Sequence, residues 1–187
     1  MPNTLHANFS PSLRPDSLRV AQGLIAETYP RLIGSGPFAG ATGTLYFAQV
    51  YLARGDILTN CHIIVGIAGV AETFARVGLW DSVTGALLAS CVDQGAGWAT
   101  VGLHSQAFSA PFTVQTSGIY YLGYLVLAGT VPGLAITLAP LANRIGLTSG
   151  IAGGPLLFGS TVGLLDLPNP LVIAAGTAPR VYWIGLS

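Results

Sequence analysis

The chain has 187 residues, which is enough for one domain with a hydrophobic core. Its seven cationic residues are scattered arginines that form no basic patch, which argues against a nucleic-acid partner. The absence of lysine excludes Schiff-base and P-loop chemistry. Only 7% of the residues are charged, against roughly 25% in an ordinary soluble domain. We therefore expect much of the surface to be covered by other subunits or to be uncharged and polar.

Residues 1–15 contain three prolines among polar residues, which predicts an extended arm, and they show no pattern of a secretory signal. Asp16 is a candidate N-cap for a short helix over Ser17–Tyr29. We predict that residues 1–32 form an anchor that docks onto a larger particle; the alternative is a helix that closes one end of the domain. The candidate anchor residues, which fall at helical spacing, are Leu18, Ala21, Ile25 and Tyr29.

A glycine-rich hinge at residues 34–43 separates this segment from a series of strand-like runs joined by turn signals. The spacing is typical of a mainly β, antiparallel β-sandwich, with a jelly roll as its eight-strand form. We place this domain at residues 42–187, with a Gly/Ala/Leu-rich excursion at about 129–170. The predicted strands are Thr44–Ala53, Ile57–Val65, Thr73–Trp80, Ala86–Val92, Trp98–His104, Pro111–Val114, Ile119–Leu127, Leu171–Ala175 and Val181–Leu186.

The run Ile119–Leu127 is apolar on both faces, which predicts a central strand buried on both sides. Hydropathy offers a rival interpretation, because residues 119–142 form an uncharged stretch long enough for a membrane-spanning helix. Pro132 and Pro140 interrupt that stretch, and no basic cluster sets an orientation. We therefore expect a strand and no membrane partner.

No nucleophile elbow and no paired-histidine metal motif occurs, so the sequence predicts neither an enzyme nor a bound cofactor or metal. Cys61, His62, Cys91 and His104 could converge on zinc, but neighbouring strand residues point to opposite faces, so Cys61 and His62 should not share one ion. Hydrogen-bonded histidines are the more plausible outcome. A Cys61–Cys91 bridge stays open, because spacing alone does not decide it.

Three carboxylates, Asp56, Asp81 and Asp93, fall in predicted turns. Aspartates in turns usually bond the local backbone, and a calcium site at one end of the sandwich is the alternative.

The candidate ligand-stacking residues are Trp80 and Trp98, which together with Trp183 could form a sugar-binding platform. Tryptophans in a sandwich are more often core residues. Exposure of at least two of them would favour carbohydrate binding, whereas burial of all three would favour a purely structural role.

Three blocks carry a resemblance: TLYFAQVYLARGDILTNCHIIVG at 44–66, GLWDSVTGALLASCVDQGAGW at 78–98, and FSAPFTVQTSGIYYLGYLVLAGTVP at 108–132. Their order resembles the β-sandwich domain repeated in tail and fibre proteins of bacteriophages that infect actinobacteria. The resemblance covers about half of the chain and leaves both ends outside it.

The resemblance implies a non-enzymatic virion protein, commonly a homotrimer, that is exposed on the capsid as a decoration protein or head fibre, or on the tail as a minor tail protein. The implied partners are copies of the chain itself and other capsid or tail subunits. The alternative is a module that binds a host-surface glycan.

Overall fold

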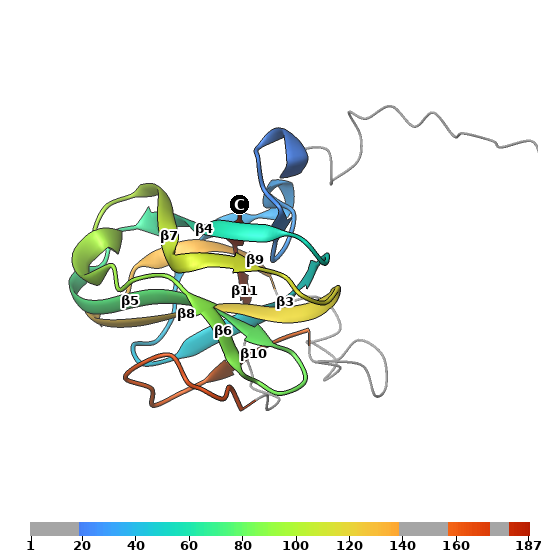
Figure 1. Ribbon diagram of the computed structural model, residues 1–187. Coiled ribbons are helices and arrows are strands. Elements are labelled where there is room, and N and C mark those ends of the chain that lie inside the picture. The colour runs from blue at the N-terminus through green and yellow to red at the C-terminus, as the bar shows by residue number, and fades with distance from the viewer. Residues whose placement is uncertain (1–18, 139–156, 173–179) are drawn as a thin grey trace, which may run out of the picture.

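The computed structural model describes residues 19–138, 157–172 and 180–187, and these form two antiparallel β-sheets packed face to face (Figure 1). The first sheet, sheet A, has the order β1 (Ala26–Glu27), β12 (Ile184–Leu186), β4 (Ile57–Ile67), β9 (Gly133–Leu138) and β11 (Arg180–Tyr182), with β2 (Ser35–Ala39) beside β9 and β7 (Gly102–Thr113) beside β4. The second, sheet B, has the order β10 (Phe158–Thr161), β3 (Leu45–Leu52), β8 (Gly118–Thr130), β5 (Val70–Asp81) and β6 (Leu87–Ser90). The prediction of a mainly β sandwich is confirmed.

The strand pairing is that of a jelly roll. Of the eight strands β2 to β9, the first pairs with the last, and the nested pairs β3–β8, β4–β7 and β5–β6 follow. The chain alternates between the sheets, so the pairs fold over into the orders β2-β9-β4-β7 and β3-β8-β5-β6. The two sheets that these strand pairs form cover the core from both sides, and no crossover helix is needed.

The C-terminal strands extend sheet A beyond the eight-strand plan. β4 and β9 pair only near Val65 and Ile67, and they diverge further along. β11 pairs with β9, and β12 pairs with β4, so these last strands fill the gap between the two. β1 then pairs with the other side of β12. Residues from both ends of the described chain therefore complete one sheet.

β8 lies in the middle of sheet B, between β3 and β5, and its residues 120–126 are all buried. Its even-numbered side chains Leu122, Tyr124 and Val126 face the core between the sheets, whereas Tyr121 and Leu125 belong to a second cluster on the outer face. The prediction of a central strand buried on both sides is confirmed.

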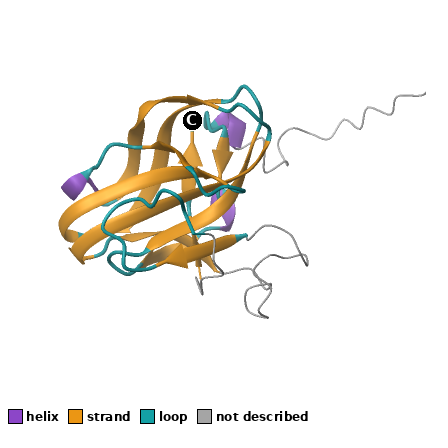
Figure 2. Ribbon diagram, turned by 60° about the horizontal axis from the view of Figure 1, so that its bottom comes forward, coloured by secondary structure: helices purple, strands orange, loops and turns teal. Residues whose placement is uncertain are grey.

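Three hydrophobic clusters make up the interior, and each contains one tryptophan. Trp98 belongs to the cluster between the sheets. Trp80 lies on the outer face of sheet B, under a segment of residues 157–172 that we call the outer segment. Trp183 belongs to the cluster that contains Leu24 and Tyr29, which come from residues 24–31, here called the N-terminal cover. The outer segment and the N-terminal cover therefore add further layers outside the two sheets of the described chain (Figure 2).

The predicted helix over Ser17–Tyr29 is wrong in extent. Of the predicted helix, only residues 19–21 are helical among those that the structure describes. Gly23 then adopts a left-handed φ of +71°, and Leu24 N–H donates to Arg19 O at 3.0 Å. A glycine in this conformation ends a helix, and the sequence interpretation ran through it. The chain then becomes extended, and Ala26 and Glu27 pair with β12.

The anchor at residues 1–32 stays a prediction, but its residues 24–31, the N-terminal cover, pack against the sandwich, and Ala26 and Glu27 pair with β12. Tyr29 is buried and Ile25 packs against the main core, whereas Ala21 is exposed. Leu18 and the predicted arm at residues 1–15 lie outside the described residues.

Several strand bounds differ from the prediction. The expected glycine-rich hinge contains the exposed strand β2, and the gap between the predicted strands Ile57–Val65 and Thr73–Trp80 is reduced to a tight connection between β4 and β5. Trp98 ends a short 3-10 helix, η3 (Gly95–Trp98), instead of starting a strand, and Pro111–Thr113 continue β7. A second 3-10 helix, η2, spans Arg31–Ile33.

The excursion predicted at 129–170 contains β9 and β10, while residues 139–156 lie outside the described part. Leu171 and Val172 are not in a strand, and residues 173–175 are not described. Val181–Leu186 is confirmed as strand, with a break at Trp183 between β11 and β12.

Candidate functional site

The two predicted ligand-stacking residues cannot stack on a ligand, because their side chains are fully buried. Trp80 and Trp98 are both 0% exposed, and Trp183 is 1% exposed. A sugar ring stacks only on an aromatic face that solvent can reach. The interpretation of Trp80 and Trp98 as a sugar-binding platform is therefore wrong.

The polar edges of two of the buried indoles form hydrogen bonds inside the protein. Trp80 Nε1 donates to Pro168 O at 2.8 Å, which ties the outer segment to sheet B. Trp183 Nε1 donates to Glu27 Oε2 at 2.9 Å, and the Arg31 guanidinium lies 4.4 Å from the centre of its ring. Each of these contacts joins a tryptophan to a covering segment. The sequence near Trp80 and Trp183 contains no pattern that predicts the outer segment or the N-terminal cover.

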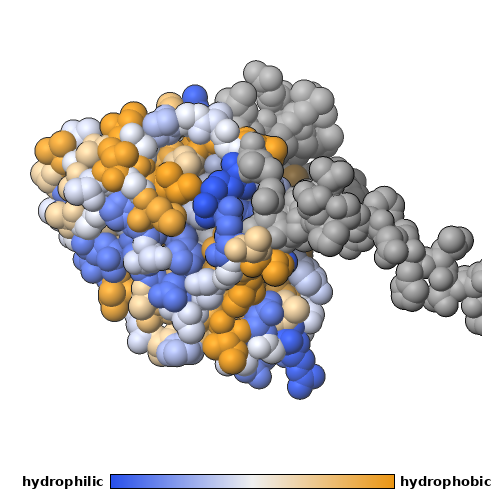
Figure 3. All heavy atoms as spheres, turned by 90° about the horizontal axis from the view of Figure 1, so that it is seen from above, coloured by the Kyte–Doolittle hydropathy of each residue, from blue (hydrophilic) through white to orange (hydrophobic). Residues whose placement is uncertain are grey.

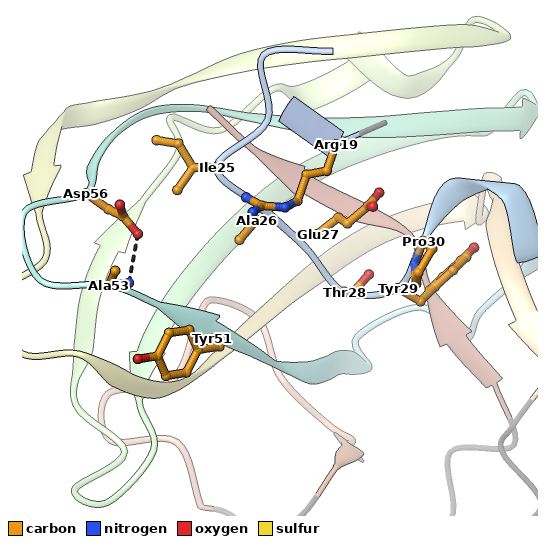
Figure 4. A pocket seen from close by; sticks show the side chains of 10 residues that line it. All are labelled: Arg19, Ile25, Ala26, Glu27, Thr28, Tyr29, Pro30, Tyr51, Ala53 and Asp56. Atoms are coloured by element: carbon orange, nitrogen blue, oxygen red, sulfur yellow. Dashed lines mark hydrogen bonds between the residues drawn. The ribbon is translucent and has the colours of Figure 1, made fainter. Parts of the chain in front are cut away.

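A groove of about 550 Å³ lies between the N-terminal cover and the end of β3 (Figure 4). Its aromatic wall is Tyr51, which is 63% exposed. Its charged groups already hold the local backbone: Asp56 accepts a bond from Ala53 N–H at 2.8 Å, and Arg19 donates to Leu24 O at 3.2 Å. With Glu27 held by Trp183, the groove presents no converging acid and base to a substrate.

His62 sits on the outer face of sheet A between two hydroxyl groups. Ser105 Oγ lies 2.5 Å from Nδ1, and Ser187 Oγ lies 2.9 Å from Nε2. Partial burial, helped by the nearby charge of Arg31, lowers the pKa of His62 below its usual value, so the ring is neutral at pH 7. The His62 imidazole therefore connects Ser105 of β7 and Ser187 to β4. The expectation of a hydrogen-bonded histidine is confirmed.

The residues considered as zinc ligands do not converge. Cys61 faces the core beside Cys91, whereas His62 faces outward and His104 bonds Thr100 O at 2.8 Å. Across residues 19–138, 157–172 and 180–187, no group of three or more His, Cys, Asp or Glu residues is arranged to hold a metal ion.

The turn carboxylates bond the backbone of their own regions. Asp81 Oδ1 accepts bonds from Val83 N–H at 3.0 Å and from Thr84 N–H at 2.7 Å, and the latter is the main cause of the lowered pKa of Asp81. Asp93 Oδ1 accepts a local bond from Gly95 N–H at 2.9 Å and a second, long-range bond from Ala75 N–H of β5 at 2.8 Å. The bonds to Val83, Thr84 and Gly95 are the local turn bonds expected for such residues.

A surface at one end of the sandwich exposes four large aliphatic side chains. They lie where β4 turns into β5 and where the chain enters β7, and Leu103 is paired with Ile64 of β4. In Figure 3, which views the molecule from above, hydrophobic residues lie at the left end and also in the middle and along the lower edge. We call this surface the apolar end; its members are Ile67 (52% exposed), Val70 (60%), Val101 (65%) and Leu103 (58%).

Glu72 lies buried beneath the apolar end. Its Oε2 accepts a bond from Trp98 N–H at 3.1 Å, while its Oε1 has no hydrogen-bond partner among the described residues and packs against Gly69. Burial raises the pKa of the Glu72 carboxyl above its usual value, against smaller opposing effects of the Trp98 bond and of His104. The Glu72 side chain therefore connects η3 to the β4–β5 turn. Because it is buried, its ionisation lowers the stability of the folded state.

We expect Glu72→Gln to change the pH dependence of stability. Because the folded-state pKa is raised, protonated Glu72 stabilises the fold fully below about pH 4, and this contribution is lost as the pH rises through the raised pKa. Glutamine keeps an oxygen for Trp98 N–H and carries no charge. In urea unfolding, the variant should be more stable than the wild type at pH 7 and should lose this advantage at pH 4. A constant difference between the two proteins at both pH values would contradict this role.

No helix in the described ranges is long and apolar enough to cross a membrane. Comparison of the chain with protein-family models, with curated proteins and with solved structures gave no match.

Proposed function

We propose that this chain is a non-enzymatic structural subunit of a bacteriophage virion that assembles as a homotrimer through its apolar end. The observation that carries the proposal is the exposure of Ile67, Val70, Val101 and Leu103 on a protein in which only 7% of residues are charged. Exposed aliphatic side chains gathered at one place favour a protein–protein contact.

The architecture supports the proposal by analogy of fold. Jelly rolls include viral capsid domains as well as lectins, and fold alone does not decide between such roles. The resemblance of residues 44–132 to phage tail and fibre domains favours the virion. The burial of all three tryptophans favours a structural role over glycan binding.

Assembly through the apolar end predicts a stable trimer that a single charge can disrupt. The wild type should have three times the monomer mass of 19.2 kDa by light scattering at micromolar concentration. Leu103→Glu should weaken association at least tenfold, because symmetry brings three buried carboxylates together. It should leave the fold intact, because Leu103 is 58% exposed in the single chain.

The matched control is Val83→Glu. Val83 is 88% exposed in the hairpin after β5, at the opposite end of that strand from Val70. This variant should remain trimeric. A monomeric wild type would overturn the assembly proposal. A Leu103→Glu trimer as stable as the wild type would show that the trimer contact does not lie at the apolar end.

The position in the particle requires a separate measurement. Antibodies against the folded chain should label purified virions on the capsid, as expected for a decoration protein or head fibre, or on the tail, as expected for a minor tail protein. Chain found only outside the particles would contradict a virion role.

A further inference from the structure

The two cysteines of the chain meet inside the sandwich. Cys61 lies in β4, and Cys91 directly follows β6, so they come from opposite sheets. Both side chains are 0% exposed, and their Sγ atoms are 2.7 Å apart. This separation is within about 1 Å of the length of a disulfide bond, roughly 2.05 Å, and is closer than sulfur atoms of two separate thiols normally approach.

The cysteines lie where the edges of the two sheets come together. β6 is an edge strand of sheet B and β7 is an edge strand of sheet A. Cys91 forms a single bridge with Phe108 of β7, and Ser109 Oγ donates to Ser90 O at 2.9 Å. Cys61 pairs with Gln106 of β7. We call this junction of β6 and β7 the seam.

The other contacts of the two sulfurs are weak. Cys61 Sγ lies 3.8 Å from Gln106 Oε1, and Cys91 Sγ lies 3.7 Å from Gln106 O. Gln106 Nε2 has no hydrogen-bond partner among the described residues. The strongest interaction open to each sulfur is therefore with the other sulfur.

We propose that Cys61 and Cys91 form an intramolecular disulfide that covalently closes the seam of the sandwich. The oxidant is a low-molecular-weight disulfide of the glutathione type. One cysteine thiolate attacks a sulfur of this disulfide and releases one thiol; the second cysteine then displaces the other thiol from the mixed disulfide. The chain loses two electrons and two protons, and the small disulfide is reduced to two thiols.

The structure also indicates when the bond forms. Burial raises the pKa of the Cys61 thiol well above its usual value, so the reactive thiolate is rare once the sandwich has closed. No solvent-accessible path reaches either sulfur, since both residues are 0% exposed. The disulfide should therefore form while the seam is still open during folding, and it should then resist reduction in the native state.

The cross-link joins residues 30 positions apart and constrains the unfolded chain. A loop of this length should raise the melting temperature of a domain of this size by roughly 10 °C. The bond would reinforce the junction at which the two sheets are held by few backbone hydrogen bonds.

Refolding in glutathione buffer provides the test. The full chain is unfolded, reduced, refolded with glutathione disulfide, and then alkylated in denaturant with and without prior reduction. The expected result is no alkylated cysteine without reduction and two with it, together with a monomer-sized band on a non-reducing denaturing gel. Two alkylated cysteines without reduction, or a cross-linked dimer band, would overturn the proposal.

The thermal measurement uses Cys61→Ala/Cys91→Ala as its control. Oxidised wild type should melt roughly 10 °C above wild type that was refolded with reductant, whereas the double variant should melt at one temperature in both buffers. Equal melting temperatures of oxidised and reduced wild type would show that no stabilising bond forms. The outcome is independent of trimer formation, because light scattering on the same samples reports assembly separately.

Discussion

Removal of residues 1–32 should unfold most of the protein, whereas removal of residues 1–18 should leave it folded. The longer deletion takes away the whole N-terminal cover, including β1 and the buried side chains of Leu24, Ala26 and Tyr29. Burial of a large aliphatic or aromatic side chain contributes about 1.5–3 kcal/mol. The total loss of at least about 5 kcal/mol is comparable with the whole stability of an ordinary domain.

The longer deletion also exposes Trp183 and leaves its Nε1 without Glu27. Tryptophan fluorescence should therefore shift to the red and the thermal transition should be lost or broadened. The shorter deletion is the matched control, because it keeps the N-terminal cover and the pairing of Ala26 and Glu27 with β12. A deletion of residues 1–32 that melts like the full chain would show that the N-terminal cover adds nothing to the sandwich.

Replacement of Trp80 by alanine should destabilise the protein by about 3–5 kcal/mol, the usual range for removal of a fully buried tryptophan. The indole packs against Gly78, where a Cβ would lie only 2.6 Å from the ring. It belongs to one hydrophobic cluster with Leu167 and Leu171 of the outer segment, and it donates to Pro168 O. Its loss leaves a cavity between sheet B and that segment.

The Trp80→Phe variant is an intermediate between the wild type and Trp80→Ala. Phenylalanine keeps an aromatic ring in the site but loses the donor to Pro168 O and part of the buried indole area, so its loss of stability should be smaller than that of alanine. Urea unfolding measures both variants, with Val83→Ala in the exposed hairpin as a neutral control. A loss below about 1 kcal/mol for Trp80→Ala would mean that the outer segment does not cover this face in solution.

The long strands were predictable because their residue types and turns are local properties. Ile57–Val65 and Ile119–Leu127 are rich in β-branched and aromatic residues, and the turn at Asp81–Gly85 has side chains that bond the nearby backbone. The alternation of such runs with turns was sufficient to predict an antiparallel sandwich. The same reasoning failed at Ser17–Tyr29, where Gly23 ended the helix after a single described turn.

The sequence by itself therefore determined the fold class, the central strand and the scarcity of charge. Only the tertiary structure decided the environment of each tryptophan, because Trp80 and Trp183 are covered by residues 88 and 156 positions away in the chain, at Pro168 and Glu27. It also brought Cys61 next to Cys91 across two sheets and gathered the apolar end from two separate segments. Burial and proximity depend on long-range pairing, and residue spacing along a strand does not record which distant segment will cover its outer face.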